Sequence, residues 1–355
     1  WLFGPYATVT RIWPGFRIRR QPPNPQSAIH NPQSFPLRQR GRYALNGVMA
    51  KSRKDLLFDQ HFLGRLQQLH LIAKRLSARE SGGARRSRRI GDGLEFADHR
   101  SYMPGDDIRF IDWPYYARME RLLLRLFHER SEADVIILLD VSASMAPGAS
   151  AGQVGGEMEK FDYAVRVAAA LAFVAMGGLE RVIVQPFGDS LGQPLHTGRN
   201  RGQILEVLDF LAELAPAGQT ALGRCCDLLA RRLDAPASVV LVSDLLDSGD
   251  NLSDALVRLK GRGCDVTVLH VYSPLDAAPD LAGPMVLQQA ETGRTMVVDV
   301  TDDVLESYRR RWAEMCDALN RTAGSRGATY VSAPSDVPFE QLVLRTLRQA
   351  GVLAG

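Results

Sequence analysis

The stretch Val135-Ile136-Ile137-Leu138-Leu139-Asp140 decides the fold of this 355-residue chain. A continuous run of valine, isoleucine and leucine is typical of a strand that is covered on both faces, as in a parallel sheet between helices. Apolar runs of the same kind recur at 239–242 and 266–271, and segments with helical periodicity lie between them, as at 160–177. Strands that alternate with helices predict an α/β fold with a doubly wound, mostly parallel sheet.

Similar patterns predict the remaining elements. We expect further strands at 122–127, 181–187, 296–298 and 328–331, and further helices at 203–214, 222–233, 252–262, 301–319 and 339–349. Ahead of them a single helix is predicted over 53–79, because apolar residues recur there on one face. These residues are Phe62, Leu66, Leu69, Ala73 and Leu76.

Residues 1–48 differ in composition from the rest of the chain. They contain seven arginines, seven of the 19 prolines and no acidic residue, and the first methionine is Met49. Such a segment has too little apolar surface to offset its ordering entropy. We expect it to be disordered, either as an upstream extension of the true start or as an organelle transit peptide. The remainder is predicted to form a small module of helix and β-strand at 49–133 and an α/β domain at 134–350.

The charge of the chain argues against one class of partner. The net charge is +3, and without residues 1–48 there are 36 basic against 40 acidic residues, which gives no electrostatic case for nucleic-acid binding. The run Arg85-Arg86-Ser87-Arg88-Arg89 is expected to be a solvated loop, with a contact to an acidic partner or nucleic acid as the alternative. No apolar run approaches the roughly 18–20 residues that cross a bilayer. We therefore expect a cytoplasmic protein without a membrane span.

Oxygen-bearing side chains lie at three predicted strand or helix ends. Asp140, Ser142 and Ser144 directly follow the first apolar run, Thr220 precedes the helix at 222–233, and Asp244 follows the strand at 239–242. Ligand sites in doubly wound sheets gather at the carboxyl ends of the strands. Carboxylate and hydroxyl oxygens are hard ligands that suit Mg²⁺ or Mn²⁺ rather than Zn²⁺. The five residues are therefore predicted to bind a divalent metal.

Each of these residues has an alternative interpretation. Serine, threonine and aspartate are common turn and capping residues after a strand, and Thr220 could cap the helix that follows it. Asp247 and Asp250 are nearby rivals of Asp244 as the aspartate of the third loop, which follows the strand at 239–242.

The arrangement resembles the von Willebrand factor A family. Its metal-ion-dependent adhesion site combines an Asp-x-Ser-x-Ser loop with a threonine and an aspartate from two further loops. The resemblance assigns those roles to Asp140, Ser142, Ser144, Thr220 and Asp244. In that family an acidic residue of a partner protein completes the coordination of the metal, which implies that the metal joins two proteins.

A second motif lies upstream. It reads Gly91-Asp92-Gly93-Leu94-Glu95-Phe96 and then Arg100-Ser101-Tyr102-Met103-Pro104-Gly105-Asp106-Asp107-Ile108-Arg109-Phe110-Ile111-Asp112-Trp113, followed by Ala117-Arg118. With the later Glu291-Thr292-Gly293, it resembles the DUF58 family of bacterial proteins over about residues 50–350. In that family such a module directly precedes a von Willebrand A-type domain. The chain resembles the subgroup without membrane helices, and the resemblance implies a MoxR-type AAA+ ATPase as a partner.

The chemistry of this motif favours a structural role. Gly105, Asp106 and Asp107 are predicted to form a turn whose carboxylates pair with arginines and fix the geometry between two modules. A second carboxylate metal site and a partner surface are the alternatives. Trp113, Tyr115 and Tyr116 are expected in the core or at the module interface. The full set assigned to the motif is Arg100, Tyr102, Gly105, Asp106, Asp107, Arg109, Asp112, Trp113 and Arg118.

The metal loop compares poorly with enzyme motifs. A haloacid-dehalogenase-like phosphatase also places an aspartate at a strand end, but it needs a second aspartate where this chain has Ser142. Neither Ser142 nor Ser144 lies in a Gly-x-Ser-x-Gly motif, and a P-loop is absent. We expect a non-enzymatic, metal-dependent adaptor protein. The alternative is a metal-dependent phosphoesterase-like hydrolase that uses Asp140.

Overall fold

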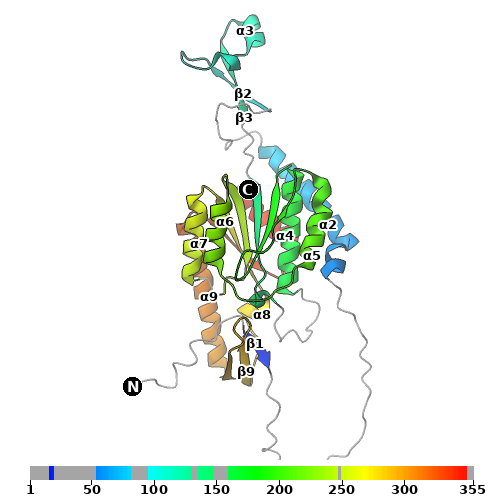
Figure 1. Ribbon diagram of the computed structural model, residues 1–355, viewed down its shortest axis with the longest axis vertical. Helices are drawn as coiled ribbons and strands as arrows, with labels where there is room; N and C mark the ends of the chain where they lie inside the picture. The colour runs from blue at the N-terminus through cyan, green and yellow to red at the C-terminus, as the bar shows by residue number, and fades with distance from the viewer. Residues whose placement is uncertain are drawn as a thin grey trace, which may run out of the picture.

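The main feature of the protein is a six-stranded sheet between two layers of helices (Figure 1). The computed structural model describes residues 16–19, 53–80, 95–128, 134–146, 159–246 and 249–349. The strands run in the order β11-β8-β7-β4-β5-β6, and all are parallel except the edge strand β6. Their bounds are β4 Asp134–Asp140, β5 Val182–Phe187, β6 Leu195–His196, β7 Ala237–Ser243, β8 Asp265–Tyr272 and β11 Thr329–Pro334. The predicted doubly wound, mostly parallel sheet is confirmed.

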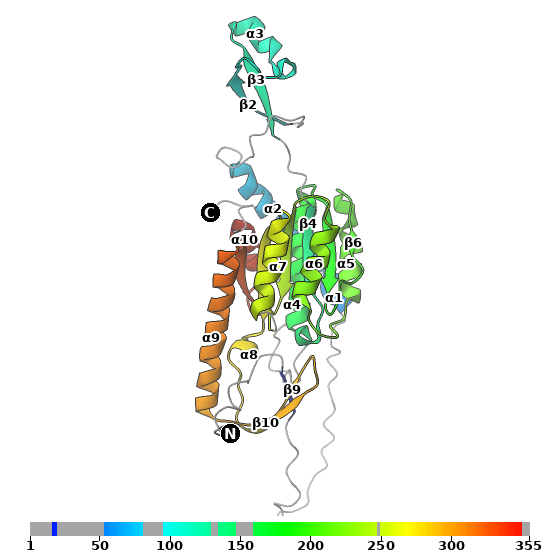
Figure 2. The same ribbon diagram turned by 60° about the vertical axis from the view of Figure 1, so that its left-hand side comes forward.

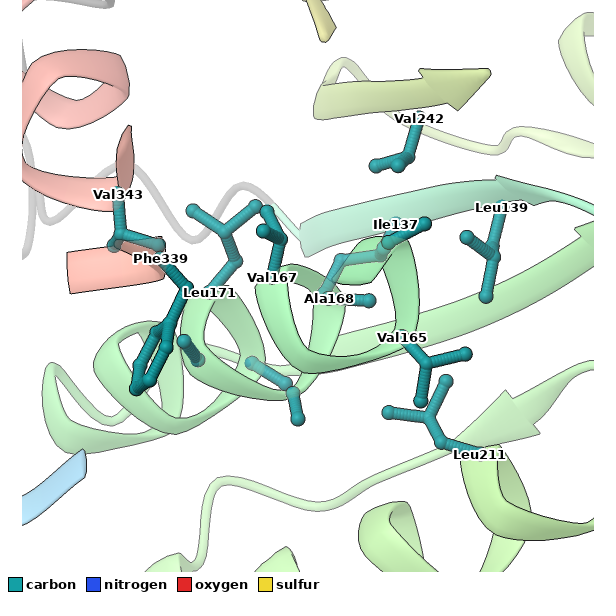
Figure 3. Packing of buried hydrophobic residues seen from close by; sticks show 14 of the residues in the cluster. Ile137, Leu139, Val165, Val167, Ala168, Leu171, Leu211, Val242, Phe339 and Val343 are labelled. Carbon is teal, nitrogen blue, oxygen red and sulfur yellow. The ribbon is translucent and has the colours of Figure 1, made fainter. Parts of the chain in front are cut away.

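Strand β4 is covered on both faces, as its uninterrupted apolar run predicted. Ile137 and Leu139 belong to one hydrophobic cluster, and Ile136 and Leu138 belong to the other. Figure 3 shows Ile137 and Leu139 beside the α4 side chains that cover the first face. The first layer comprises α1 Arg53–Leu57, α2 Gln60–Glu80, α4 Lys160–Gly177, α5 Ile204–Glu213 and α10 Phe339–Gln349. The second comprises α6 Leu222–Arg232, α7 Gly249–Gly261 and α9 Asp302–Ser325.

Helices α1 and α2 differ from the prediction in two ways. The predicted single helix is broken after α1, and α2 begins at Gln60. The predicted apolar face is buried from Phe62 to Ala73. It packs into the hydrophobic cluster on the first face of the large sheet rather than within a separate module. Phe62 contacts the ring of Phe339 in α10 at a centroid distance of 5.1 Å. Periodicity shows that a helix face is buried, but it does not show which surface covers it.

A small antiparallel unit follows α2. Strand β2, Glu95–Ser101, pairs with β3, Leu123–His128, and between them lie a short 3-10 helix, Ile108–Phe110, and α3, Trp113–Met119. In Figures 1 and 2 this unit stands apart from the large sheet. The sequence predicted β3 but neither β2 nor α3.

A second small sheet follows β8. After the short helix α8, Pro274–Ala277, strand β9, Gly283–Gln289, forms a hairpin with β10, Thr295–Val300. Strand β1, Phe16–Arg19, adds antiparallel to β9. The hairpin lies beyond the end of the large sheet that carries α8 (Figure 2).

The expectation that residues 1–48 are disordered is wrong for Phe16–Arg19, which form strand β1. The segment Phe16-Arg17-Ile18-Arg19 alternates apolar and charged residues, a strand pattern that the surrounding arginines and prolines obscure. The other residues of this range, and the run at 85–89, lie outside the described residues. Among the residues that the structure describes, no helix has both the length and the apolar character needed to cross a membrane.

Candidate metal centre

The candidate site lies where the winding of the sheet reverses. From β4 the chain builds outward through β5 and β6 on one side, and through β7, β8 and β11 on the other. In doubly wound sheets, ligands bind in the crevice at the carboxyl ends of the two strands that flank such a reversal. Asp140 is the last residue of β4, and Ser243 is the last residue of β7. The topology therefore brings the loops after these two strands together.

Asp140 is the buried centre of this arrangement. Its Oδ1 accepts the backbone N–H of Ser142 at 2.9 Å, and its Oδ2 accepts the hydroxyl of Ser243 at 2.5 Å. Burial, and then the charge of Asp244, raise the pKa of Asp140 to about 7. Two carboxylates removed from water at one point are unfavourable unless a cation lies with them. The buried ammonium of Lys160 is hydrogen-bonded to Asp244, so Asp140 is the carboxylate for which a bound metal ion would compensate.

The two serine hydroxyls have a spacing that suits a small metal ion. Ser142 and Ser144 are both buried, and their Oγ atoms lie 2.9 Å apart. That distance is the length of the hydrogen bond between the two hydroxyls, and it is also the separation of about 2.9 Å between neighbouring ligands of an octahedral ion with bonds of 2.0–2.1 Å. Within the described residues no three His, Cys, Asp or Glu side chains converge as a metal cluster, so the site depends on these hydroxyls. The residues present fit Mg²⁺ or Mn²⁺.

Two backbone hydrogen bonds hold the threonine loop beside the aspartate loop. The N–H of Ala143 donates to the carbonyl of Gly218 at 3.0 Å, and the N–H of Ala217 donates to the carbonyl of Val141 at 2.7 Å. Gly218 has a φ of +77°, a backbone conformation that favours glycine. The turn brings Thr220 toward the site without using it as a cap, because the N-cap of α6 is Ala221.

The Thr220 hydroxyl has an acidic partner from a distant part of the chain. It donates to Glu291 Oε1 at 2.9 Å, and the Thr220 backbone N–H donates to Glu291 Oε2 at 3.3 Å. Glu291 lies in the turn of the β9–β10 hairpin. The sequence singled out Glu291 only as part of the family pattern.

Asp244 is paired with a lysine that the sequence did not assign to the site. Lys160, the first residue of α4, donates from Nζ to Asp244 Oδ2 at 2.8 Å and lies 3.6 Å from Asp276 Oδ2. Burial alone would lower the pKa of Lys160, but Asp244, Asp276 and Asp140 outweigh it and hold that pKa above its ordinary value. A lysine in the first turn opposes the helix dipole. In the sequence, this unfavourable position at the start of a predicted helix is the feature that distinguishes Lys160 as a candidate site residue.

The two rivals of Asp244 are Asp247 and Asp250. Asp247 lies outside the described residues, as does the side chain of Asp250.

The predicted carboxylate–arginine pairs of the upstream motif form, but they lie within the β2–β3 unit and do not fix the geometry between two modules as predicted. Arg100 donates to Asp106 at 2.7 Å, and the backbone N–H of Met103 donates to the same carboxylate at 2.8 Å. The Met103 N–H, followed by Arg100, lowers the pKa of Asp106. Asp107 pairs in the same way with Arg109, two residues away. These pairs stabilise a local turn, at which Gly105 has a φ of +106°.

The remaining motif residues also act locally. Asp112 caps α3 by accepting the N–H of Tyr115 at 3.0 Å, and it lies 2.8 Å from His99 Nε2. Tyr102 is half-buried, and Arg118 is exposed in the last turn of α3. The expected position in the core or at the module interface is wrong for Trp113 and Tyr116, since 54% and 41% of their surfaces are exposed, while Tyr115 is half-buried. A two-stranded unit with one short helix has no second layer to cover such side chains.

The comparisons with known proteins agree with the upstream motif. The family model described as "Protein of unknown function DUF58" matches residues 98–318. Uncharacterized proteins of Mycobacterium bovis and Mycobacterium tuberculosis are 28% identical to the chain over 270 residues, which are 75% of this chain and 83% of each relative.

Two solved structures are similar to the chain at lower sequence identity. An aerotolerance-related membrane protein from Bacteroides fragilis is 16% identical, with a TM-score of 0.38 over 62% of this chain and 100% of its own. A von Willebrand factor type A protein from Catenulispora acidiphila is 15% identical, with a TM-score of 0.33 over 64% of this chain and 44% of its own.

Proposed function

Since the chain belongs to the DUF58 family and has a von Willebrand factor A-type fold, we propose that it is a non-catalytic adaptor that binds a divalent metal and, through it, an acidic residue of a partner protein. The metal is Mg²⁺ or Mn²⁺. The ligands are the oxygens of Asp140, Ser142, Ser144 and Thr220, with Asp244 acting through a water molecule.

One observation carries the proposal. Asp140 is wholly buried at the carboxyl end of a central strand, with Asp244 close enough to raise its pKa and two serine hydroxyls beside it. Nothing in ordinary packing requires a carboxylate at this depth, and its desolvation is costly without a cation. When bound, the metal would supply Lewis acidity toward a carboxylate of the partner. An acidic partner fits because Asp140 is the one carboxylate of the proposed set that contacts the metal directly. A doubly charged ion would therefore keep positive charge toward the partner.

The sequence of the loop disfavours the phosphoesterase alternative. A nucleophilic aspartate needs one carboxylate oxygen directed at the substrate. A haloacid-dehalogenase-like site also has a second aspartate two residues after the nucleophile, and that position is Ser142 here. Release of phosphate from an ester, abolished by the same change at Asp140, would support the alternative.

Titration calorimetry with MgCl₂ tests the metal site directly. Asp140→Asn keeps the shape of the side chain and removes its charge, and we expect it to abolish the binding heat. Ser144→Ala should weaken binding at least about tenfold, since even outer-shell partners contribute that much. The matched control is Asp189→Asn, an exposed aspartate shortly after β5. Equal affinity in the wild type and Asp140→Asn would overturn the proposed site.

The partner class is tested separately. The family resemblance makes a MoxR-type AAA+ ATPase the first partner to examine. We expect the purified ATPase to bind the immobilised wild-type protein in Mg²⁺ and to be released by a chelator, while Asp140→Asn fails to bind it. Binding that ignores both the chelator and the substitution would contradict a metal-mediated contact.

A further inference from the structure

The β9–β10 hairpin places a carboxylate against the threonine of the candidate site. Glu291 receives two hydrogen bonds from Thr220, one from the hydroxyl at 2.9 Å and one from the backbone N–H at 3.3 Å. Both oxygens of Glu291 are thereby directed to one residue. That residue is 71 positions away in the chain and is one of the five proposed metal ligands.

The hairpin is built to hold this carboxylate at its tip. Strands β9 and β10 pair from Gly283–Val300 to Gln288–Thr295, so only a tight turn separates them. Within the turn, the Gln289 N–H donates to Arg294 at 2.7 Å, and the Gly293 N–H donates to Gln289 at 2.9 Å. Gly293 has a φ of +70°, which a glycine adopts without strain. Glu291 is therefore presented by an ordered turn rather than by a free loop.

Glu291 contacts Thr220 with a carboxylate, which is the group that the proposed function assigns to a partner protein. A protein held by a metal at this site would present an acidic side chain, and Glu291 is an acidic side chain already at the threonine ligand. We propose that Glu291 is an internal ligand of the metal centre, which a partner's carboxylate must displace. The hairpin then acts as a latch on the binding site. This inference rests on the proposed function, because it assumes that the centre binds a metal.

If the hairpin covers the site, the simplest ligand for the uncovered site is the tip of the hairpin itself. A peptide with the sequence of the hairpin tip, Gln288 to Arg294, carries the same carboxylate in the same local sequence. A tethered group competes with a free one at an effective concentration in the millimolar range for short connections. Removing the tethered carboxylate should therefore allow the free peptide to bind.

The test compares wild type with Glu291→Gln, which keeps the size of the side chain. Asp299→Asn is the matched control, an exposed acidic residue of the same hairpin. The probe is a fluorescent peptide of residues 288–294 with blocked termini, measured by anisotropy. In Mg²⁺ we expect Glu291→Gln to bind it about tenfold or more tightly than wild type or Asp299→Asn. A chelator, or glutamine in place of the peptide's glutamate, should abolish the binding.

Two further measurements separate the possible failures. Hydrogen exchange should accelerate at the Thr220 amide in a further variant, Glu291→Ala, with or without metal, because that N–H then loses its acceptor. Calorimetry shows whether the three proteins bind Mg²⁺. If all bind Mg²⁺ and the peptide binds them equally or not at all, the latch is wrong and the metal site stands. If none binds Mg²⁺, the proposed function is wrong and the latch falls with it.

Discussion

The ammonium group of Lys160 lies 2.8 Å from the carboxylate of Asp244, and both side chains are buried. This pair joins the first turn of α4 to the loop after β7, 84 positions away in the chain. It also places a positive charge beside the proposed metal ligands. A tethered ammonium and a divalent ion would compete for the same carboxylates, so Lys160 would affect how strongly the proposed centre binds a metal.

Replacing Lys160 with glutamine should make the stability of the protein depend on metal. Without the ammonium, Asp244 becomes an uncompensated buried charge, and loss of one partner of a buried pair costs about 3–5 kcal/mol. We expect that loss in urea unfolding with a chelator present, and a substantial recovery in Mg²⁺. Lys54→Gln is the control, because Lys54 forms an exposed pair with Asp209 and should change little. An equal loss with and without Mg²⁺ would mean that metal and lysine do not share these carboxylates.

A second prediction concerns α2, which packs against the α/β layer. Phe62 is buried against Phe339, so Phe62→Ala should lower the free energy of unfolding by about 3–5 kcal/mol. Leu71 lies on the same helix with 53% of its surface exposed, and Leu71→Ala should cost less than about 1 kcal/mol. Urea unfolding followed by circular dichroism measures both. If Phe62→Ala produced a separate early transition, α2 would be an appended helix and not part of the core.

The predictable parts of the molecule are those with local signals. The apolar run of β4 and the polar loop after it lie within ten residues, and the order of strands brings Asp140 and Asp244 to the same edge. Lys160, Asp276 and Glu291 were not predicted as site residues. Each gains its role from a contact with a segment far away in the chain, and neither composition nor periodicity records such contacts.

The missed elements have a related cause. Strand β9 contains a proline and two glutamines, and it is a strand because β10 and β1 pair with it. The edge strand β6 has only two residues, too short for any period. Trp113 was expected in the core on the basis of residue type alone, but exposure depends on whether a second layer covers the unit.

The last prediction uses one chemical change at two glycines. An added Cβ would meet no neighbouring atom within 4 Å at Gly64, in the second turn of α2, or at Gly218, in the threonine loop. The two sites differ only in backbone conformation, since Gly218 has a φ of +77°. Gly64→Ala should stabilise the protein by about 0.5–1 kcal/mol, because alanine favours a helix and loses less chain entropy. Gly218→Ala should destabilise it by about 1–2 kcal/mol, the cost of a left-handed conformation with a side chain.

The same pair separates stability from binding. If Gly218 positions Thr220 as a ligand, Gly218→Ala should also weaken Mg²⁺ binding in calorimetry, whereas Gly64→Ala should leave it unchanged. A loss of stability in Gly218→Ala with unaltered Mg²⁺ affinity would remove Thr220 from the ligand set. Asp140 would keep its role in that case, because its two carboxylate oxygens are held by the Ser142 N–H and the Ser243 hydroxyl.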